Sequence, residues 1–258
     1  MVSRAKPLGR TNEGGLPDGA SGHNDRKRLQ VRLLGNFELL VAGEPKVIPQ
    51  PGQRLIAMLA LDHGGWLGRT QIAGTLWPDS TETAARSNLR SALSSLGSLR
   101  SIVVETTPDN LRLEPHVTVD LQNCRRIARR MLDGPDHVTG GLLSAFAADL
   151  LPHWDDGWLE PERESYRQLR LHLLEKMSER LTREGRFGRA VEAGLLAVAA
   201  APLRESAHRA VIRALAAEGN RGEALDRYNA LAAMLNRELG VEPSFRFEDV
   251  LVEANRHS

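Results

Sequence analysis

Two arginines, Arg86 and Arg90, stand one helical turn apart in the segment ETAARSNLRSALSSLG (residues 82–97). No Asp or Glu occurs from Thr83 to Val104, although the whole chain carries 34 basic and 33 acidic residues. A solvated helix normally mixes both charges along its outer face. A face that offers guanidinium groups and hydroxyls without any carboxylate is instead suited to a partner that is itself negatively charged.

The pattern of this segment predicts an amphipathic helix. Ser80 or Thr81 is placed to cap it, and Glu82 lies in its first turn, where a negative charge is favourable. The apolar side chains recur at helical spacing and form one stripe, made of Ala85, Leu89, Ala92, Leu93 and Leu96. The polar side chains occupy the opposite face and are Arg86, Ser87, Arg90, Ser91, Ser94 and Ser95.

The neighbouring segments predict what positions this helix. Short β-favouring runs at 31–34, 37–41 and 46–48 indicate a small antiparallel meander, and the helical pattern then begins after Pro51 and ends at Gly64-Gly65. Thr70 is placed to cap a short helix that ends before Trp77-Pro78. After the arginine helix, strands at 102–105 and 111–113 with a turn at 107–110 indicate a hairpin. This is the order of a winged helix-turn-helix, whose third helix enters the major groove of DNA.

The second half of the chain is predicted to be helical and to contain a repeat. LTREGRFGRAVEAG, from Leu181, aligns with LAAEGNRGEALDRY, from Leu215, at an offset of 34 residues. Gly185 and Gly219 coincide in the turn, and Ala190 and Ala224 coincide where two helices approach closely. A period of 34 residues is typical of tetratricopeptide helix pairs, which usually present a surface to partner proteins. The fold class is therefore mainly α with a small β component.

Length and composition allow two domains. We expect a disordered tail at 1–28, a winged-helix domain at 29–119 and a helical repeat domain at 120–258. The block from 26 to 115 has eleven basic and eight acidic residues, a net charge of +3, which supports a nucleic-acid contact only weakly. The single cysteine, Cys124, fits a reducing cytoplasm, and no apolar run is long enough to cross a membrane.

Other chemistries fit the sequence less well. His153, Asp155 and Asp156 in HWDDGWLEPERE lack the spacing of an established metal site, and Trp154 and Trp158 are expected to pack the two domains together. The run RRIARR (125–130) fits a solvated helix face better than a second DNA-binding patch. Phosphate-binding glycine loops, nucleophile elbows and paired Cys/His sets do not occur, so we expect no enzyme, no cofactor and no metal.

Several stretches together resemble one family. VRLLGNFEL, QRLIAMLAL, LWPD, ARSNLRSALSSL and VTVDL resemble the OmpR-type winged helix of SARP-type regulators, the pathway-specific activators of antibiotic biosynthesis in actinobacteria. RESYRQLRLHLLEKMSERL, PLRESAHRAVIRALAAEG, ALDRYNAL and RELGVEPS resemble their tetratricopeptide-like bacterial transcriptional activator domain. The resemblance covers about residues 29–250 in the domain order of the family.

The resemblance implies a cytoplasmic transcriptional activator that binds direct repeats near the −35 region of promoter DNA and recruits RNA polymerase, including its sigma factor. Two copies would lie side by side on such repeats, which allows self-association on DNA. Carried over to this chain, the expected DNA contacts are Arg86, Ser87, Asn88, Arg90, Ser91 and Ser94 of the recognition helix, Arg54 of the first helix, and Thr107 and Asn110 of the wing.

The chain departs from the family in one place that concerns DNA. The recognition helix of the family usually ends in a more basic SRLRR-like run, whereas here it reads SSLGSLR. Each lost phosphate contact would reduce the slope of log binding constant against log salt concentration by roughly one unit. The alternative function from another class is an interaction adaptor, in which the winged helix and the repeats both bind proteins. An adaptor has no reason to exclude carboxylates from the arginine helix.

Overall fold

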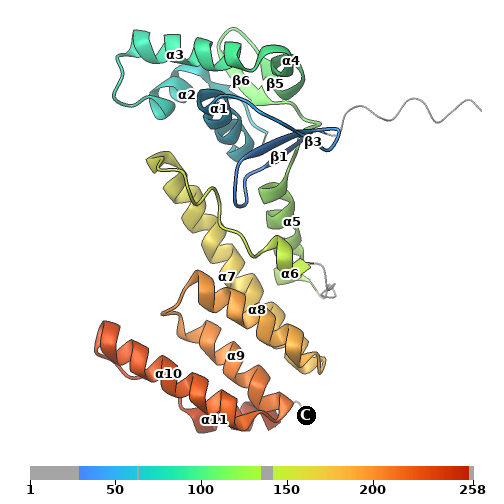
Figure 1. Cartoon of the computed structure of the whole chain (residues 1–258), viewed down its shortest axis with the longest axis vertical. Helices are drawn as coiled ribbons and strands as arrows, with labels where there is room; N and C mark the ends of the chain where they lie inside the picture. The colour runs from blue at the N-terminus through green and yellow to red at the C-terminus, as the bar shows by residue number, and fades with distance from the viewer. Residues whose placement is uncertain (1–28, 63, 135–141, 256–258) are drawn as a thin grey trace, which may run out of the picture.

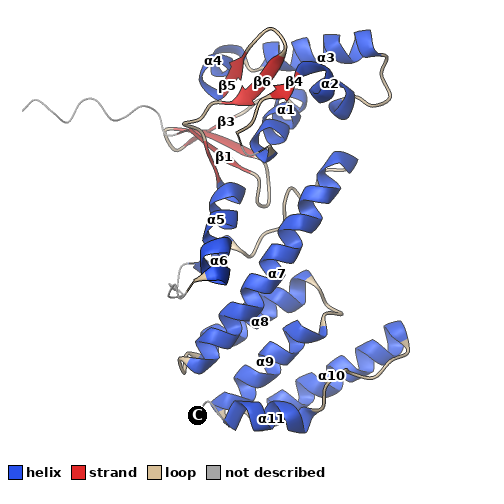
Figure 2. Ribbon diagram, turned by 180° about the vertical axis from the view of Figure 1, so that it is seen from behind, coloured by secondary structure: helices blue, strands red, loops and turns tan. Residues whose placement is uncertain are grey.

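The computed structural model describes residues 29–62, 64–134 and 142–255, so the tail expected at 1–28 lies outside the described residues. The chain is elongated, with a mixed α/β part at one end and a stack of helices at the other (Figure 1). Figure 2 shows that the strands all belong to the first part. In the part of the chain that the structure describes, no helix is both long and apolar enough to cross a membrane.

A four-stranded sheet opens the α/β part. It is built from β1 (Leu29–Arg32), β2 (Glu38–Val41), β3 (Glu44–Lys46) and β7 (Thr118–Val119), in the order β3-β2-β1-β7. The meander is antiparallel as expected, but its third strand lies at 44–46 instead of 46–48. The sequence pattern did not predict β7, which pairs with β1 in parallel. Ala42 and Gly43 both adopt positive φ, 55° and 84°, to make the turn before β3.

Three helices and a second sheet follow. The helices are α1 (Gln50–Leu61), α2 (Arg69–Leu76) and α3 (Glu82–Ser95), and the sheet has the order β4-β6-β5, with β4 Leu67–Gly68, β5 Val104–Thr106 and β6 Asn110–Leu113. This is the expected winged helix-turn-helix, and β4 adds a third strand to the wing. The described fold is thus mainly α with a small β component, as the sequence indicates.

Two local predictions about these elements are wrong. Thr70 does not cap α2, because the helix starts at Arg69 with Gly68 as its N-cap. Ile102 and Val103 do not open a strand; after a 3₁₀ turn at Gly97–Leu99 they belong to the short helix α4 (Arg100–Val103). Both side chains are β-branched, which favoured a strand, but α4 brings Val103 into the core with no exposed area.

The two parts of the molecule are joined through the end of β1. Helix α5 (Asp120–Asp133) begins with a carboxylate that accepts hydrogen bonds from the backbone N–H groups of Leu33 and Leu34, at 2.9–3.1 Å. Leu34 in turn forms an antiparallel bridge with Leu150, which follows the short helix α6 (Leu142–Ala145). Contacts at this junction are therefore made by backbone and side chain alike.

The remaining helices form the repeat. They are α7 (Glu160–Arg183), α8 (Phe187–Ala200), α9 (Glu205–Glu218), α10 (Arg221–Leu239) and α11 (Phe247–Asn255), with a 3₁₀ turn at Gly157–Leu159 before α7. Gly185 and Gly219 turn the chain between the paired helices with φ of 70° and 98°, and Ala190 and Ala224 are fully buried. The 34-residue period thus corresponds to the helix pairs α7–α8 and α9–α10.

Candidate nucleic-acid interface

Helix α3 exposes the face that the sequence indicates. The Thr81 hydroxyl caps the helix by accepting from the backbone N–H of Ala84 at 3.3 Å, and the apolar stripe from Ala85 to Leu96 is buried. Asn88 is half-buried. The exposed side chains on the polar face are Arg86, Ser87, Arg90, Ser91 and Ser94. The cap fixes where the helix begins, and the stripe fixes which side chains point outward.

An open hollow lies beside this face and joins three elements. It is bounded by α3, by the start of α2 and by the turn of the wing; its lining residues are Gly68, Arg69, Thr70, Arg86, Leu89, Arg90, Pro108, Asp109 and Asn110. The structure therefore brings Arg86 and Arg90 together with Asn110, three of the residues expected to contact DNA.

Arg69 fixes the wing to the start of α2. Its backbone N–H donates to the carbonyl of Asp109 at 2.8 Å, and its guanidinium donates to the carbonyl of Thr107 at 3.0 and 3.2 Å. Burial, and then the positive charge of Arg100, lower the pKa of Arg69, while Asp109 acts in the opposite direction. Arg100 therefore lies close enough to add positive charge to this side of the domain.

Thr107 and Asn110 close the turn of the wing. The Thr107 hydroxyl accepts from the backbone N–H of Asn110 at 3.0 Å, and the Thr107 N–H donates to the Asn110 carbonyl at 2.9 Å. The Thr107 side chain is thus used within the wing, and Pro108 and Asp109 form its exposed tip.

The two arginines of α3 differ in their surroundings. Arg86 forms an ion pair with Glu82 at 2.7 Å and donates to the hydroxyl of Thr70 at 3.2 Å. Arg90 makes no hydrogen bond or ion pair with any residue that the structure describes. A phosphate or a base can bind Arg90 without displacing a protein partner, whereas at Arg86 it competes with Glu82.

Arg54 does not belong to this surface, and its expected role at a phosphate is corrected. Its guanidinium is half-buried, forms an ion pair with Asp156 and donates to the carbonyl of Leu76 at 3.0 Å. In the sequence, Arg54 follows Gln53 at the start of a predicted helix, and no nearby residue indicates a partner for its charge. The structure shows that it is used between the two parts of the chain.

Sequence reasoning missed several residues of the hollow. Arg69 and Thr70 open a short helix with no distinctive pattern, and Asp109 lies in the wing turn, outside the acid-free stretch 83–104. Arg100 lies within the acid-free segment, which was the only signal that could have found it. Arg69 reaches the hollow because β4 pairs with β6, and a strand of two residues is too short to be predicted from the sequence.

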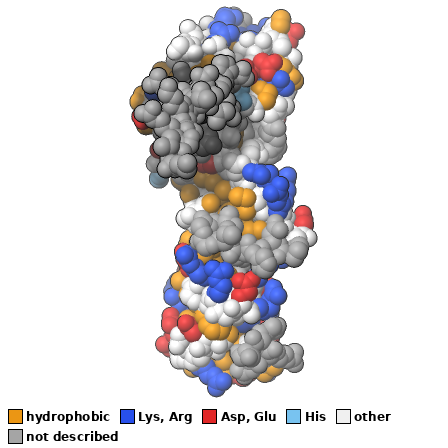
Figure 3. All heavy atoms as spheres, turned by 90° about the vertical axis from the view of Figure 1, so that its right-hand side faces the viewer, with side chains coloured by type: hydrophobic (Ala, Val, Ile, Leu, Met, Phe, Trp, Pro, Cys, Tyr) orange, Lys and Arg blue, Asp and Glu red, His pale blue; other side chains and the backbone are white. Residues whose placement is uncertain are grey.

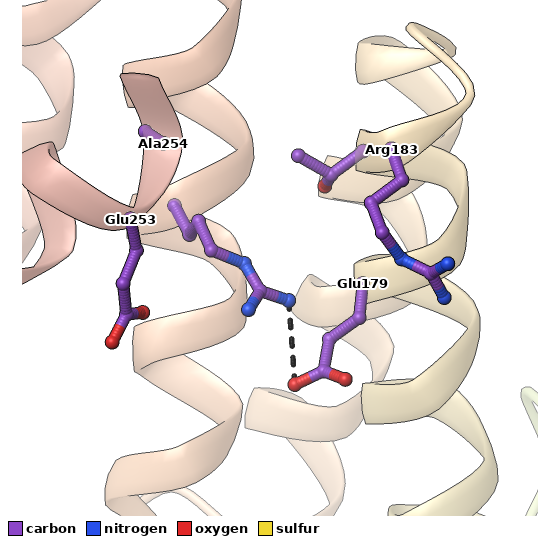
Figure 4. Close-up of a pocket in the computed structure, with 6 residues that line it drawn as sticks. Glu179, Arg183, Glu253 and Ala254 are labelled. Carbon is purple, nitrogen blue, oxygen red and sulfur yellow. Dashed lines mark ion pairs between the residues drawn. The ribbon is translucent and has the colours of Figure 1, made fainter. Parts of the chain in front are cut away.

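Two further clusters outside this surface are held by contacts within the chain. Trp154 stacks on Phe37 with ring centroids 5.9 Å apart, so its expected packing between the two parts is confirmed. A small pocket between α7, α9 and α11 contains Glu179, Arg183, Glu253 and Ala254, and Figure 4 shows the ion pair of Glu179 that crosses it. That pair joins Glu179 to Arg213 at 3.3 Å. In the described residues, no group of three or more His, Cys, Asp or Glu is arranged to hold a metal.

The fold and the site define a winged-helix protein with an appended helical repeat domain. Residues 136–251 match the family model described as bacterial transcriptional activator domain. No curated protein is similar enough in sequence to match. Among solved structures, the chain is similar to Mycobacterium tuberculosis EmbR in complex with a low affinity phosphopeptide, with 20% identity and a TM-score of 0.66. The alignment covers 90% of this chain and 66% of the EmbR chain, so this chain spans about two thirds of that length.

These findings confirm the resemblance drawn from the motifs. The match to the bacterial transcriptional activator domain at 136–251, behind a winged helix, supports the likeness to SARP-type regulators. The identity to EmbR is too low to carry more than the fold.

Proposed function

We propose that this chain is a cytoplasmic transcriptional activator that binds promoter DNA sequence-specifically through α3 and the wing. The observation that carries the proposal is the hollow in which Arg69, Arg86 and Arg90 meet the turn of the wing, beside the exposed serines of α3. We infer that the two domains divide the work, with DNA bound at 29–119 and protein partners at 120–258.

The chemistry of α3 suits the major groove. Small serine side chains let the helix approach the base edges, and an arginine can donate two hydrogen bonds to O6 and N7 of guanine. Arg90 is free to do so, since it has no partner among the described residues. Arg86, Arg69 and Arg100 supply positive charge for the phosphates, which fix the position of the protein on the duplex. We keep Ser87, Asn88, Ser91, Ser94, Thr107 and Asn110 as the further contact residues, Thr107 through its backbone, because its hydroxyl closes the wing.

The family resemblance supports the finer parts of the proposal. It points to direct repeats near the −35 region, to recruitment of RNA polymerase with its sigma factor, and to a gene cluster for antibiotic biosynthesis. The helical repeats at 160–255 are the surface that we assign to protein partners.

The proposal is tested by selecting DNA from a random pool with the full chain, beside the Arg90→Ala variant and a matched control, Arg221→Ala. Arg221 is exposed on α10 and also has no side-chain partner among the described residues. We expect a tandem repeat to be enriched by the wild type and the control, lost with Arg90→Ala, and bound more weakly at higher salt.

An absence of enrichment at low salt by a folded chain would refute DNA binding and favour the adaptor. Binding that is equal in Arg90→Ala would show that α3 does not read the DNA. The two outcomes are distinguishable: the first would contradict DNA binding itself, and the second would contradict only its assignment to α3.

A further inference from the structure

Arginines that lack an ion pair are unevenly distributed over the described part of the chain. Arg69 and Arg90 line the hollow of the winged helix, and the charge of Arg100 acts on Arg69. A second group lies on α5 and α7 and consists of Arg126, Arg129, Arg130 and Arg183. Most other described arginines pair with a carboxylate in the chain. Because unpaired guanidinium groups gather where an anionic partner binds, the second group marks a second candidate surface.

Helix α5 is held in a way that turns these arginines outward. On its inner side the buried guanidinium of Arg125 forms an ion pair with Glu162 of α7 at 2.6 Å. The neighbouring Arg126, Arg129 and Arg130 are all exposed. The only described side-chain partner of these three is the neutral amide of Asn123, which accepts from Arg126 at 3.1 Å. The four arginines of RRIARR therefore have two roles. Arg125 stabilises the packing of α5 on α7, and the other three are exposed to solvent.

A hollow of about 260 Å³ lies between the end of α5 and α7. Its floor is apolar and includes Met131, Leu173 and Met177, which are buried. Its rim is basic and carries Lys176, Arg180 and Arg183. Lys176 also donates to the carbonyl of Leu132 and so ties the rim to the last turn of α5. Methionine side chains adapt to differently shaped apolar partners, as they do in surfaces that bind amphipathic helices.

The position of α5 separates this surface from the DNA site. Figures 1 and 2 show α3 at the far end of the molecule and α5 between the first sheet and the helical repeats. Figure 3 shows Lys and Arg side chains gathered at this middle level. A straight duplex bound along α3 lies away from α5, and a duplex offers nothing to an apolar floor. The combination of methionines and cations favours a protein partner.

We propose that the hollow between α5 and α7, together with the exposed arginines of α5, binds an acidic amphipathic helix of a partner protein. Apolar side chains of that helix enter the hollow above Met131 and Met177. Its carboxylates pair with Arg126, Arg129 and Arg130 along α5 and with Arg183 on the rim. The proposal does not depend on DNA binding by α3.

The test uses a fluorescent synthetic peptide with leucines at i, i+3, i+4 and i+7 and glutamates between them. Its anisotropy is followed as the full chain is added. We expect saturable binding that is weakened about tenfold in the triple variant Arg126→Gln/Arg129→Gln/Arg130→Gln, because several exposed charge pairs together reach roughly that effect. The matched control is Arg221→Gln/Arg227→Gln/Arg246→Gln, which removes the same charge at the other end of the chain, from the exposed Arg221 and Arg246 and the half-buried Arg227. This control is expected to bind as the wild type does.

Three outcomes overturn the proposal. They are equal weakening by both triple variants, equal binding of a peptide in which the same leucines are scattered around the helix, and failure of the peptide to slow hydrogen exchange in 120–133 and 173–183. Full competition by an unrelated duplex would show a nucleic-acid surface instead. DNA binding is measured in the same variants, so a chain that binds the peptide and no DNA contradicts only the function proposed above.

Discussion

The Arg54 guanidinium and the Asp156 carboxylate, 102 residues apart in the sequence, form an ion pair between α1 and the loop before α7. The same carboxylate oxygen accepts from the indole N–H of Trp158 at 3.1 Å. The side chains of Arg54 and Asp156 are only 23% and 11% exposed, so solvent screens the pair weakly. The Asp156 carboxylate thus binds both Arg54 of the winged-helix part and Trp158 at the start of the repeat part.

Replacing Asp156 by alanine is expected to lower the free energy of unfolding by about 1–3 kcal/mol, because it leaves the Arg54 charge half-buried without its partner. Denaturant unfolding followed by circular dichroism measures the change. Asp155→Ala is the matched control, since Asp155 is adjacent and exposed, and it should change stability by less than about 0.5 kcal/mol. If both variants unfold as the wild type does, the ion pair contributes nothing to stability.

Arg86→Ala and Arg90→Ala are both expected to abolish specific DNA binding and to leave the free energy of unfolding within about 0.5 kcal/mol of the wild type. Both side chains are exposed, and the Arg86–Glu82 pair is an exposed i,i+4 pair. Gel-shift titration on the selected repeat and thermal unfolding provide the two measurements. A variant that no longer folds would place its arginine in the structure and not in the interface.

Glu82→Gln should strengthen DNA binding. Glu82 pairs with Arg86 at 2.7 Å and is itself exposed beside the surface where phosphates would lie. Its removal frees Arg86 and takes away one repulsive charge, so we expect several-fold tighter binding and a steeper salt dependence by up to about one unit. The cost to stability is about 0.3–1 kcal/mol, because a negative charge is lost from the first turn of α3. Unchanged affinity would indicate that Arg86 does not touch the phosphates.

Most of this fold could be predicted from the sequence because its signals are local. The apolar stripe of α3, its cap and the repeated glycine and alanine of the helix pairs are each set within a few residues. Strand β7 could not be predicted in this way, since two residues gain their hydrogen bonds from β1 nearly ninety positions earlier. The packing of α4 likewise overrode the β propensity of Ile102 and Val103.

The candidate site could be predicted only in part for the same reason. Arg86 and Arg90 share a helix, and their spacing alone places them on one face. Arg69 and Asp109 come together because a wing folds back onto α2, and Arg54 is removed from the site by a carboxylate from the other half of the chain. Each of these depends on contacts between distant segments, which a single sequence does not show.

Cys124 is expected to resist alkylation in the native chain. Burial, and then the charge of Asp120, raise the pKa of its thiol to about 11, from an ordinary value of 9.0, and its Sγ lies 3.5 Å from the carbonyl of Ala145. The thiolate is the reactive form, so iodoacetamide at pH 8 should modify the unfolded chain far faster than the folded one. Rapid modification of the folded chain would contradict the buried position of this side chain.

The same shift makes stability depend on pH. The folded chain keeps the thiol proton up to a higher pH than the unfolded chain, so this contribution is present below pH 9 and is lost as the pH rises towards about 11. Burial also raises the pKa of Tyr166 above its ordinary value, which acts in the same direction. The contribution of the thiol is measured by comparing the wild type with Cys124→Ala. The free energy of unfolding of the variant should fall by about 1–3 kcal/mol less than that of the wild type as the pH rises from 9 towards about 11.

Gly194→Ala and Gly188→Ala should have opposite effects although both glycines lie in α8. A Cβ at Gly194 would approach Cγ2 of Val211 to 2.5 Å and the backbone nitrogen of Val211 to 3.3 Å, so α8 and α9 could not pack as closely. We expect this variant to lose about 1–3 kcal/mol of stability. A Cβ at Gly188 meets nothing within 4 Å, and alanine favours the helix, so that variant should gain about 0.5–1 kcal/mol. Chemical denaturation of both proteins measures the difference, and equal stability would mean that the two repeats are not held together by this close approach.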